Sequence, residues 1–437
     1  MSKIVILGTG MGGFGAAYRL NAEGFLPEMY DKNAYHGGHT ASFEFDSGFL
    51  FDQGPHISFT KDPRIQDLFA DSVNQQYETV QINLNNYWRG YWPQHPVQLH
   101  LHGLPDDVIV KVIADFVEER VTERPIGNYA DWLISSFGRT FAELFPMQYT
   151  RKYHLTTADN MSIDWLGPRL YRPTLEEMLM GALSPSAPHM HYITHFRYPK
   201  HGGFVSYLKK LVPLGNLKFN HELVSVDPRR RQLIFSNGVV ARYDALISSV
   251  PLPDLIRFIQ GTPQDVLDAA QRLACSTCVL VNIGVNREDL SGSHLTYFYD
   301  EDISFTRLSF PHMLSTQNVP PGTGSIQAEI YFSEKYKPMT GSPNDWIEPV
   351  IRDLNHCGLL REQDRILFKN AMLLRYANVI FDLERTASLK IVHGYLDDLG
   401  ITYCGRYGDW GYMWTDESFK SGELAADRAL STAMSSQ

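Results

Sequence analysis

A glycine-rich turn between a predicted strand and a predicted helix constrains this chain more than any other feature. Residues 3–7 (KIVIL) form a short apolar run that is typical of a buried parallel strand. Gly8, Gly10 and Gly13 then follow at G-x-G-x-x-G spacing, and residues 14–20 favour a helix. The first glycine permits a tight turn, the second lets the backbone approach a pyrophosphate, and the third lets the helix pack closely on the strand. The arrangement predicts a dinucleotide-binding turn.

An acidic residue near the end of the next predicted strand supports this interpretation. Asp31 lies 21 residues after Gly10, close to the position from which an acidic side chain would bind ribose hydroxyls. The helix that follows the turn presents free backbone N–H groups and a partial positive charge to phosphates. A purely structural glycine turn is the alternative. The predicted cofactor-binding residues of this segment are Gly8, Gly10, Met11, Gly12, Gly13, Asp31 and Lys32.

The size and charge of the chain limit its architecture and its partners. At 437 residues it is too long for one compact core, so we expect two or more intertwined domains. A formal net charge of −10 argues against nucleic acid as a partner, because the nucleic-acid backbone requires a basic surface. Aromatic residues make up 12% of the chain, which suits a pocket that stacks flat rings or sugars. We expect a small-molecule substrate, and the sequence is compatible with a homo-oligomer.

The four cysteines predict neither a disulfide framework nor a metal site. Cys275 and Cys278 have C-x-x-C spacing, but residues 279–283 continue directly as an apolar strand, and the sequence has no second pair to complete a metal site. The first predicted strand begins within three residues of Met1, so we expect no signal peptide. No apolar run approaches the roughly 18 residues needed to span a membrane. These features predict a cytoplasmic enzyme without a membrane span.

A second glycine pair and a Gly-Pro-His turn follow the first motif. Gly37 and Gly38 allow a second close approach of the backbone, and Thr40 can donate a hydrogen bond to phosphate. Residues 43–52 predict a β-hairpin with an Asp-Ser-Gly turn. The hairpin leads into the sequence Q-G-P-H at residues 53–56.

This combination of motifs resembles the FAD-binding flavoenzymes of the superfamily that contains amine oxidases, protoporphyrinogen oxidase and UDP-galactopyranose mutase. The resemblance implies FAD as the cofactor. In that superfamily the glycine pair is commonly followed by arginine, whereas this chain has His39, with Thr40 and Ser42 as candidate substitutes in the pyrophosphate contact. The Gly-x-His segment resembles the mutase pattern near the flavin ring, which implies a catalytic and flavin-binding role for His56. Gly38, His39 and Thr40 join the predicted cofactor-binding residues.

The next region predicts a helical insertion that could shape a substrate cleft. Residues 106–119 have the pattern of an amphipathic helix, and residues 129–145 have the pattern of another. Prolines then separate shorter segments. The segments around Tyr149 and Lys152, and around Arg169, resemble parts of the mutases and their oxidase-like relatives that lie beside flavin and substrate. The resemblance implies substrate binding by all three residues and a catalytic role for Arg169, which would otherwise be interpreted as part of a surface ion pair.

The middle of the chain carries a turn that returns to the flavin domain in this superfamily. The sequence F-R-Y-P-K-H-G-G at residues 196–203 resembles that turn. Residues 220–227 alternate as a strand, in which the resemblance places the backbone of Val224 at the adenine of the cofactor. Residues 275–390 contain alternating strands and helical pieces that suit the floor of a substrate cleft, but the sequence does not assign their pocket-facing side. Tyr376 lies where relatives carry a tyrosine-rich turn near substrate.

The C-terminal segment carries the most specific late motif. A predicted strand at residues 401–404 is followed by G-R-x-x-x-x-x-Y-x-x-x-D, which resembles the C-terminal motif of the mutases and their oxidase-like relatives. The resemblance implies that Arg406 and Tyr412 contact flavin and substrate phosphates, with Tyr412 as a catalytic candidate. A helix that begins near Asp416 could stabilise charge on the flavin pyrimidine through its dipole. The cofactor contacts predicted here are Gly405, Arg406, Tyr412 and Met413.

These elements predict an α/β fold with an α+β substrate region. By resemblance, the fold is a Rossmann-like FAD-binding domain of the glutathione-reductase type, with an inserted helical region and a mixed-sheet substrate domain. The predicted FAD-binding domain is discontinuous and comprises residues 1–75, 196–265 and 395–437. The predicted helical cap comprises residues 76–195, and the predicted mixed-sheet domain comprises residues 266–394.

Three functional hypotheses follow from the sequence. The first is an FAD-dependent oxidoreductase of the amine oxidase type that acts on a nucleotide-linked sugar or a related small molecule, with His56, Tyr149, Lys152 and Tyr412 as candidate bases. The second is a non-redox mutase that uses reduced flavin on a nucleotide sugar, in which Arg169 and Arg406 would hold the diphosphate through their bidentate guanidinium groups. The third is a flavin-binding scaffold without enzymatic activity.

Overall fold

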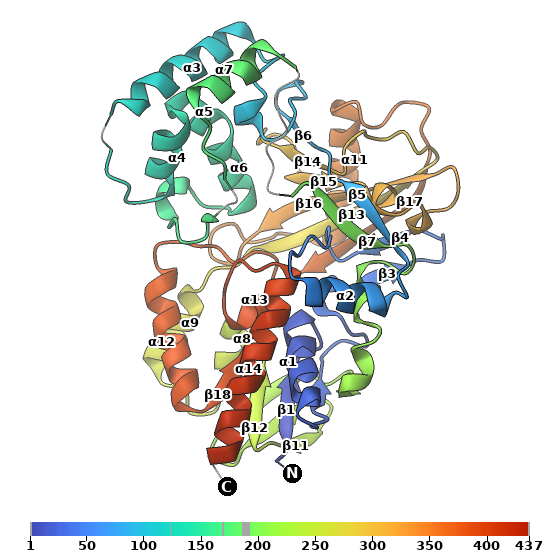
Figure 1. The fold of residues 1–437 in the computed structure, drawn as a ribbon, viewed down its shortest axis with the longest axis vertical. Coiled ribbons are helices and arrows are strands. Elements are labelled where there is room, and N and C mark those ends of the chain that lie inside the picture. The colour runs from blue at the N-terminus through green and yellow to red at the C-terminus, as the bar shows by residue number, and fades with distance from the viewer. Residues whose placement is uncertain (1, 123, 168–169, 186–192, 436–437) are drawn as a thin grey trace.

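The computed structural model describes residues 2–122, 124–167, 170–185 and 193–435 as an elongated molecule with its two chain ends together at one end (Figure 1). A parallel sheet with its helices forms the lower part in Figure 1, a mixed sheet lies above it, and a group of helices forms the top. None of the described helices is long and apolar enough to cross a membrane. The mixed α/β architecture predicted from the sequence is confirmed.

The lower part is built on a five-stranded sheet in which every neighbouring pair of strands is parallel. Its central strand begins the chain, and segments distant in the sequence complete the sheet on both sides. The predicted strand at the N-terminus is fully buried, as expected for a strand covered on both faces. In spatial order, the strands are β18 (Ile401–Tyr403), β12 (Ala245–Ser248), β1 (Ile4–Leu7), β2 (Glu28–Tyr30) and β8 (Asn216–Lys218).

Two helices from opposite ends of the chain pack tightly beside this sheet. Helix α1 (Met11–Ala22) follows β1, and α14 (Thr415–Ser435) ends the described chain. Glycines make the close approach possible on both sides. A Cβ atom added at Gly15 would lie 1.9 Å from the Phe419 carbonyl oxygen, and one added at Gly422 would lie 1.9 Å from that of Gly12. The C-terminal helix is therefore fixed directly against the glycine-rich turn.

Smaller elements surround the parallel sheet. A three-stranded sheet follows the order β11-β10-β9, and the predicted hairpin at residues 43–52 is present as β3 and β4. The bounds are β3 (Ser42–Glu44), β4 (Leu50–Asp52), β9 (Leu223–Asp227), β10 (Gln232–Phe235), β11 (Val240–Arg242), α2 (Pro63–Ser72), α8 (Leu252–Phe258), α9 (Gln264–Arg272), α12 (Arg385–Asp398) and α13 (Gly405–Gly408).

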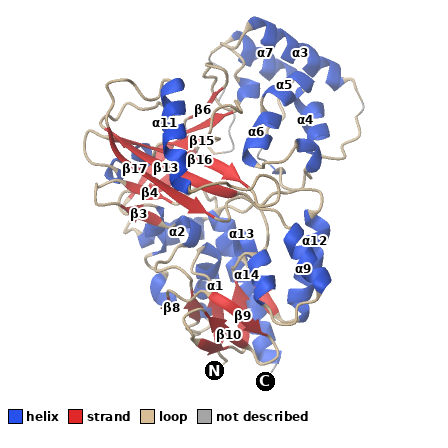
Figure 2. Cartoon of the chain, turned by 180° about the vertical axis from the view of Figure 1, so that it is seen from behind, coloured by secondary structure: helices blue, strands red, loops and turns tan. Residues whose placement is uncertain are grey.

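The middle of the molecule is a six-stranded mixed sheet (Figure 2). Its two long central strands pair antiparallel over nine residues each, and both are buried along almost their whole length. In spatial order, the strands are β17 (Ile366–Leu374), β13 (Thr277–Val285), β16 (Gly324–Phe332), β15 (Arg307–Ser309), β14 (Leu295–Phe298) and β6 (Leu84–Tyr87). Helix α11 (Ile347–His356) packs near β17, and β5 (Tyr77–Gln81) pairs with β7 (His195–Pro199).

Among the described residues, five α-helices form the cap at the top of the molecule. The amphipathic pattern of residues 106–119 is confirmed as a helix whose buried side includes Val112 and Phe116. The α3 helix contacts α4, α5 and α7, and α6 leads from the cap down to the mixed sheet. The helices are α3 (Asp106–Arg120), α4 (Tyr129–Phe137), α5 (Arg139–Leu144), α6 (Pro146–Tyr153) and α7 (Leu175–Leu183).

Two helices predicted from the sequence differ in the structure. Residues 129–145, predicted as one helix, are divided at Gly138, whose φ of 81° ends α4 and starts α5. A Cβ at this glycine would lie 2.6 Å from the backbone nitrogen of Phe116, so α3 packs against the break. The helix-like segment after residue 204 is a 3₁₀ helix, η5 (Phe204–Leu208), instead of an α-helix. Within the range predicted as helical cap, β6 belongs to the mixed sheet.

Candidate functional site

A large cavity of about 1120 Å³ runs between the glycine-rich turn, the mixed sheet and the cap. Pockets for small ligands are typically about 300–1,000 Å³, so this one has room for more than a drug-sized molecule. Its wall is assembled from segments spread along the whole chain. Of the predicted site residues, it is lined by Gly8, Gly10, Met11, Gly12, Asp31, Lys32, Gly38, His39, Thr40, His56, Tyr149, Tyr376, Gly405, Arg406, Tyr412 and Met413.

The glycine-rich turn leaves one end of the cavity open to a phosphate group. Gly8 has a φ of 101°, which favours glycine, and a Cβ at Gly13 would lie 2.1 Å from the Gly8 carbonyl oxygen. Around Gly10 the nearest atoms to such a Cβ are 3.8 Å away. The Gly10 N-cap of α1 makes no side-chain capping bond, so the first N–H groups of the helix remain available to an anion. These observations fit a bound dinucleotide.

Asp31 follows the second strand of the parallel sheet and lies at the same end of the cavity. Its Oδ2 accepts hydrogen bonds from the Thr9 backbone nitrogen at 2.9 Å and from Thr9 Oγ1 at 2.7 Å. Its Oδ1 accepts from the Asn33 backbone nitrogen at 2.9 Å. These bonds hold the carboxylate in one orientation, and Oδ1, which accepts a single bond, keeps lone-pair capacity for a hydroxyl group. The arrangement fits the predicted contact with ribose.

Two histidines that line the cavity are held in the neutral form. Burial lowers the pKa of His39 to about 3 and the pKa of His56 to about 4, and the nearby Arg406 guanidinium acts in the same direction on both. His56 Nδ1 lies 2.9 Å from the Gly54 carbonyl oxygen, which a neutral Nδ1–H donor satisfies. His39 Nδ1 is buried and has no hydrogen-bond partner within the described residues. A bound cofactor with a polar group at this point would satisfy it.

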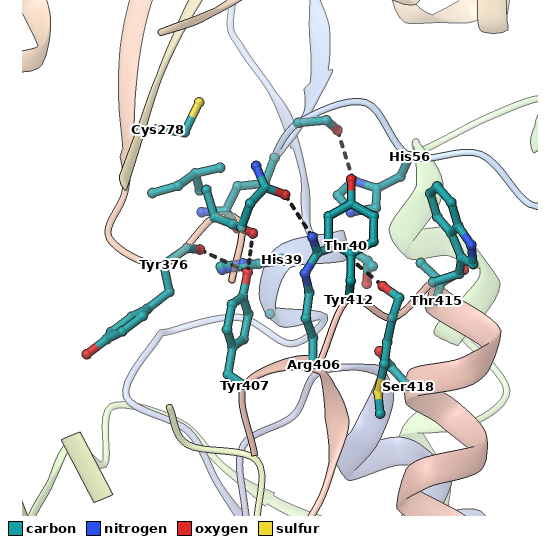
Figure 3. Close-up of a pocket in the computed structure, with 18 of the residues that line it drawn as sticks. His39, Thr40, His56, Cys278, Tyr376, Arg406, Tyr407, Tyr412, Thr415 and Ser418 are labelled. Carbon is teal, nitrogen blue, oxygen red and sulfur yellow. Dashed lines mark hydrogen bonds between the residues drawn. The ribbon is translucent and has the colours of Figure 1, made fainter. Parts of the chain in front are cut away.

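Arg406 lies between Tyr407 and Tyr412 in the view of Figure 3. Its Nη2 donates to Asn378 Oδ1 at 2.7 Å and its Nη1 to the Met413 carbonyl oxygen at 3.3 Å, while its Nε is buried without a partner in the described chain. The guanidinium lies 4.8 Å from the ring centroid of Tyr412. Since the two acceptors carry no formal charge, the positive charge of Arg406 remains available to an anion in the cavity.

The position of Arg406 is fixed next to the glycine-rich turn. A Cβ atom at Gly12 would lie 3.1 Å from Cα of Gly405, so these two backbone segments touch. The Gly405 backbone nitrogen donates to Ser421 Oγ at 2.9 Å, which ties α13 to α14. The N-terminal and C-terminal motifs therefore meet at one place.

A buried ion pair that the sequence reasoning missed lies at the mixed-sheet end of the cavity. Arg307 Nε and Nη2 donate to the two carboxylate oxygens of Glu329 at 2.5 and 3.0 Å, and the Tyr331 hydroxyl donates to the same carboxylate at 2.7 Å. Burial alone would lower the pKa of Arg307, but Glu329 raises it well above its usual value. The Arg307 guanidinium therefore stays charged, and its charge is compensated by the carboxylate that it binds.

Tyrosine side chains surround this ion pair. The Tyr153 hydroxyl lies 3.1 Å from that of Tyr412, and the Arg307 guanidinium lies 5.3 Å from the centroid of the Tyr153 ring. Burial raises the pKa of Tyr149 and of Tyr153 well above the usual value, so both remain protonated and can donate hydrogen bonds. Such a wall suits a substrate that carries several hydroxyl groups. The tyrosines that line this part are Tyr149, Tyr153, Tyr297, Tyr299, Tyr331 and Tyr412.

The structure places four predicted site residues away from the cavity wall or leaves them undescribed. The ammonium group of Lys152 donates to the carbonyl oxygens of Asp300 and Phe305, at 2.6 and 2.7 Å, so it ties α6 to the mixed sheet and is not part of the lining. Val224 is exposed, and its neighbours Glu222 and Leu223 line the cavity, so the contact of the Val224 backbone with the adenine stays a prediction. Gly13 packs behind the turn, and Arg169 lies outside the described residues.

The comparisons with known proteins agree with this geometry. The model of the NAD(P)-binding Rossmann-like domain matches residues 6–72. A solved structure of reduced UDP-galactopyranose mutase is similar over 99% of this chain and 96% of its own, with a TM-score of 0.90 and 28% identity. A putative protoporphyrinogen oxidase from Exiguobacterium sp. 255-15 covers 99% of both chains with a TM-score of 0.74 and 13% identity, which shows a shared fold.

A curated relative matches over a shorter region. The 4,4'-diapolycopene oxygenase of Methylomonas sp is 24% identical over 338 residues, which is 68% of this chain and 66% of that protein. The matched region is therefore slightly less than two thirds of the relative's length. The chain has the fold of the FAD-dependent amine oxidase and protoporphyrinogen oxidase-like enzymes, and the predictions of an FAD-dependent enzyme and of that fold are confirmed.

Proposed function

We propose that this chain is an FAD-dependent mutase that rearranges the sugar ring of a nucleotide-linked sugar without net oxidation. The observation that carries the proposal is the continuous cavity, which runs from the glycine-rich turn to a tyrosine-lined end beside Arg307 and Glu329. The similarity to UDP-galactopyranose mutase over nearly the whole of both chains supports this choice.

The residues divide the cavity into a cofactor end and a substrate end. The glycine-rich turn, the N-terminus of α1 and Asp31 would hold the dinucleotide, and Arg406 would hold an anionic group beside it. When bound, FAD supplies a redox-active ring next to the reacting carbon. At the substrate end, tyrosine hydroxyls would donate hydrogen bonds to sugar oxygens, and the carboxylate of Glu329 would accept a hydrogen bond from a sugar hydroxyl. The aromatic walls keep water away from the reacting centre.

Oxidation of the substrate is the second candidate function, and one observation favours it. Glu329 already neutralises Arg307, so the substrate end offers less attraction to a diphosphate than a free arginine would. A flavoenzyme that takes a hydride from a carbon bearing an alcohol or amine needs no such attraction. The oxygenase among the curated relatives is consistent with redox chemistry.

An anaerobic experiment separates the two candidates. The purified yellow protein is mixed with UDP-galactopyranose and related nucleotide sugars, before and after reduction by dithionite. We expect turnover only with the reduced protein and no net redox change. Bleaching of the oxidised flavin by the sugar alone would support oxidation and refute the mutase assignment.

A variant of Arg406 tests the assignment of the anion site. Arg406→Ala removes the guanidinium that has no bonded carboxylate within the described chain, so we expect at least a tenfold rise in the dissociation constant of FAD or of the nucleotide sugar. Arg229→Ala, at an exposed position of the β9–β10 turn, is the matched control. Wild-type affinity for both ligands in the Arg406 variant would contradict the assignment.

A further inference from the structure

The segment between β17 and α12 holds the guanidinium of Arg406 through one side-chain amide. Asn378 belongs to this segment, is only 6% exposed and lines the cavity. Its Oδ1 accepts from Nη2 of Arg406 at 2.7 Å, which is the shorter of the two hydrogen bonds that this guanidinium makes within the described residues. Because an arginine can only donate, the amide must present its oxygen to Arg406 and keeps its NH₂ group for another acceptor. The bond therefore fixes the orientation of both side chains.

The backbone around Asn378 is held on two sides. On one side, the Asn378 backbone nitrogen donates to Ser276 Oγ at 3.0 Å, and the Ser276 backbone nitrogen donates to the Asn378 carbonyl oxygen at 2.8 Å. On the other side, the Tyr407 hydroxyl donates to the carbonyl oxygens of Tyr376 and Ala377 at 3.0 and 2.8 Å (Figure 3). Because Tyr407 belongs to α13, the helix that carries the guanidinium also fixes the backbone of its acceptor.

A second arginine in the same cavity shows what a charged partner does. Arg307 donates to both carboxylate oxygens of Glu329, at 2.5 and 3.0 Å, and its positive charge is compensated. Arg406 instead donates to an uncharged amide and to an uncharged backbone carbonyl group. A buried guanidinium needs acceptors for its N–H groups, since an unmade hydrogen bond in the interior is costly. A neutral acceptor meets that need without cancelling the charge.

An aspartate in place of Asn378 would keep nearly the same shape and would still accept the hydrogen bond. It would also place a negative charge within hydrogen-bond distance of Arg406, and so cancel most of the attraction of this arginine for an anionic ligand. We propose that Asn378 is the positioning residue of the anion site: its neutral amide holds the Arg406 guanidinium in place and preserves its charge for the ligand. This role rests on the proposed function, in which Arg406 holds an anionic group of the cofactor or of the substrate.

A purely structural role for Asn378 makes the opposite prediction. If the amide only filled space and satisfied a buried donor, Asn378→Asp would be tolerated, because the shape and the acceptor remain. Asn378→Ala would then be the harmful change. If the amide serves the anion site, Asn378→Asp is the harmful change because it cancels a charge, whereas Asn378→Ala keeps the charge and loses one bond. The order of the two variants therefore separates the two roles.

Ligand titrations of these variants test the proposal. The dissociation constant of UDP is measured by calorimetry on the protein with bound FAD, and that of FAD by fluorescence titration after the flavin is removed. We expect Asn378→Asp to raise at least one of the two constants tenfold or more, and Asn378→Ala to raise the same constant about threefold. Asn355→Asp, at an exposed position of α11 outside the cavity wall, adds the same charge and is the matched control. It should leave both constants unchanged.

A double-variant cycle shows whether Asn378 acts through Arg406. In the Arg406→Ala background, Asn378→Ala should cause no further change, because the guanidinium that the amide positions is gone. Three results would each overturn the proposal: wild-type constants for both ligands in Asn378→Asp, a larger loss in Asn378→Ala than in Asn378→Asp, or an equal loss from Asn378→Ala in both backgrounds.

The same measurements separate failure of this role from failure of the proposed function. A wild type that does not bind UDP contradicts the nucleotide-linked substrate, and the FAD constant then decides the role of Asn378. An effect of Arg406→Ala without an effect of Asn378→Asp refutes the role of Asn378 and leaves the assignment of Arg406 standing. Wild-type constants in both of these variants would refute the anion site itself.

Discussion

The buried pair of Arg307 and Glu329 gives the sharpest test of how the cavity is held together. Only 3% of the Glu329 side chain and 20% of the Arg307 side chain are exposed. Glu329→Gln preserves the shape but leaves the guanidinium without its counterion. Removing one partner of a buried pair costs about 3–5 kcal/mol. Because the glutamine carbonyl still accepts a hydrogen bond, we expect a loss of about 3 kcal/mol in the free energy of unfolding.

A double-mutant cycle measures the coupling directly. Urea unfolding followed by circular dichroism compares Glu329→Gln, Arg307→Met and the double variant. In the double variant the unpaired cation is gone, and the glutamine amide can still accept a hydrogen bond from Tyr331. The loss of unfolding free energy in the double variant should therefore be about 2–3 kcal/mol smaller than the summed losses of the two single variants. The exposed pair Arg139–Glu143, with both side chains 54% exposed, is the control and should show coupling below about 0.5 kcal/mol. Additive losses at Arg307 and Glu329 would refute the reasoning.

Three further predictions concern a buried carboxyl group, a close glycine contact and two buried histidines. Burial raises the pKa of Asp52 to about 6, so the contribution of this carboxyl group to stability is full below about pH 4 and is lost as the pH rises to about 6. The difference in the free energy of unfolding between wild type and Asp52→Asn should therefore change by about 3 kcal/mol across that window. A difference that stays constant with pH would contradict this prediction. Gly422→Ala should lower the ratio of flavin to protein absorbance, because the new Cβ would lie 1.9 Å from the Gly12 carbonyl oxygen. The matched control is Gly394→Ala in α12, which has open space around it and should stabilise the protein by about 0.5–1 kcal/mol. With pKa values of about 3 and 4, His39 and His56 stay neutral above about pH 5. Their titration should therefore not change the dissociation constant of FAD between about pH 6 and pH 8, which a fluorescence titration measures. A tenfold change over this range would count against the neutral state of the two histidines.

The cofactor end could be predicted from the sequence because its determinants are local. The turn from Gly8 to Gly13 needs glycine for reasons that a few neighbouring residues decide, and the structure shows the positive φ at Gly8 and the tight packing at Gly13. The C-terminal motif was also recognisable, since Gly405 and Arg406 belong to one short segment. What the sequence could not provide was the contact between Gly405 and Gly12, which depends on the packing of α1 against α14.

The substrate end could not be predicted in the same way because it depends on strand register. Arg307 and Glu329 face each other across the antiparallel pair of β15 and β16, which no local motif encodes. A signal was nevertheless present in the sequence. Along β16, Gln327, Glu329 and Tyr331 alternate with apolar residues, so polar groups occupy one face of a buried strand. A buried polar face of this kind predicts a network or a pocket, although the partner residue follows only from the sheet.

Lys152 illustrates how the direction of a side chain depends on what surrounds its helix. The sequence placed this residue beside Tyr149, and both lie on α6. Three residues apart, their side chains leave the helix about 60° apart. Tyr149 lines the cavity, whereas Lys152 reaches the carbonyl oxygens of Asp300 and Phe305. Which of two such neighbours faces a ligand depends on what lies on each side of the helix, here the cavity and the β14–β15 connection.

Two of the arginines that line the cavity, Arg307 and Arg406, differ in charge compensation. Arg307 is neutralised by a bidentate carboxylate, whereas Arg406 bonds to an amide and a carbonyl oxygen. His39 and His56 add no positive charge, because burial keeps them neutral. Of these groups, Arg406 and the N-terminus of α1 therefore offer attraction to an anion, at the place where the motifs from both ends of the chain meet. At the tyrosine-lined end, hydrogen-bond geometry and not the paired charge of Arg307 would select the sugar ring of the proposed substrate.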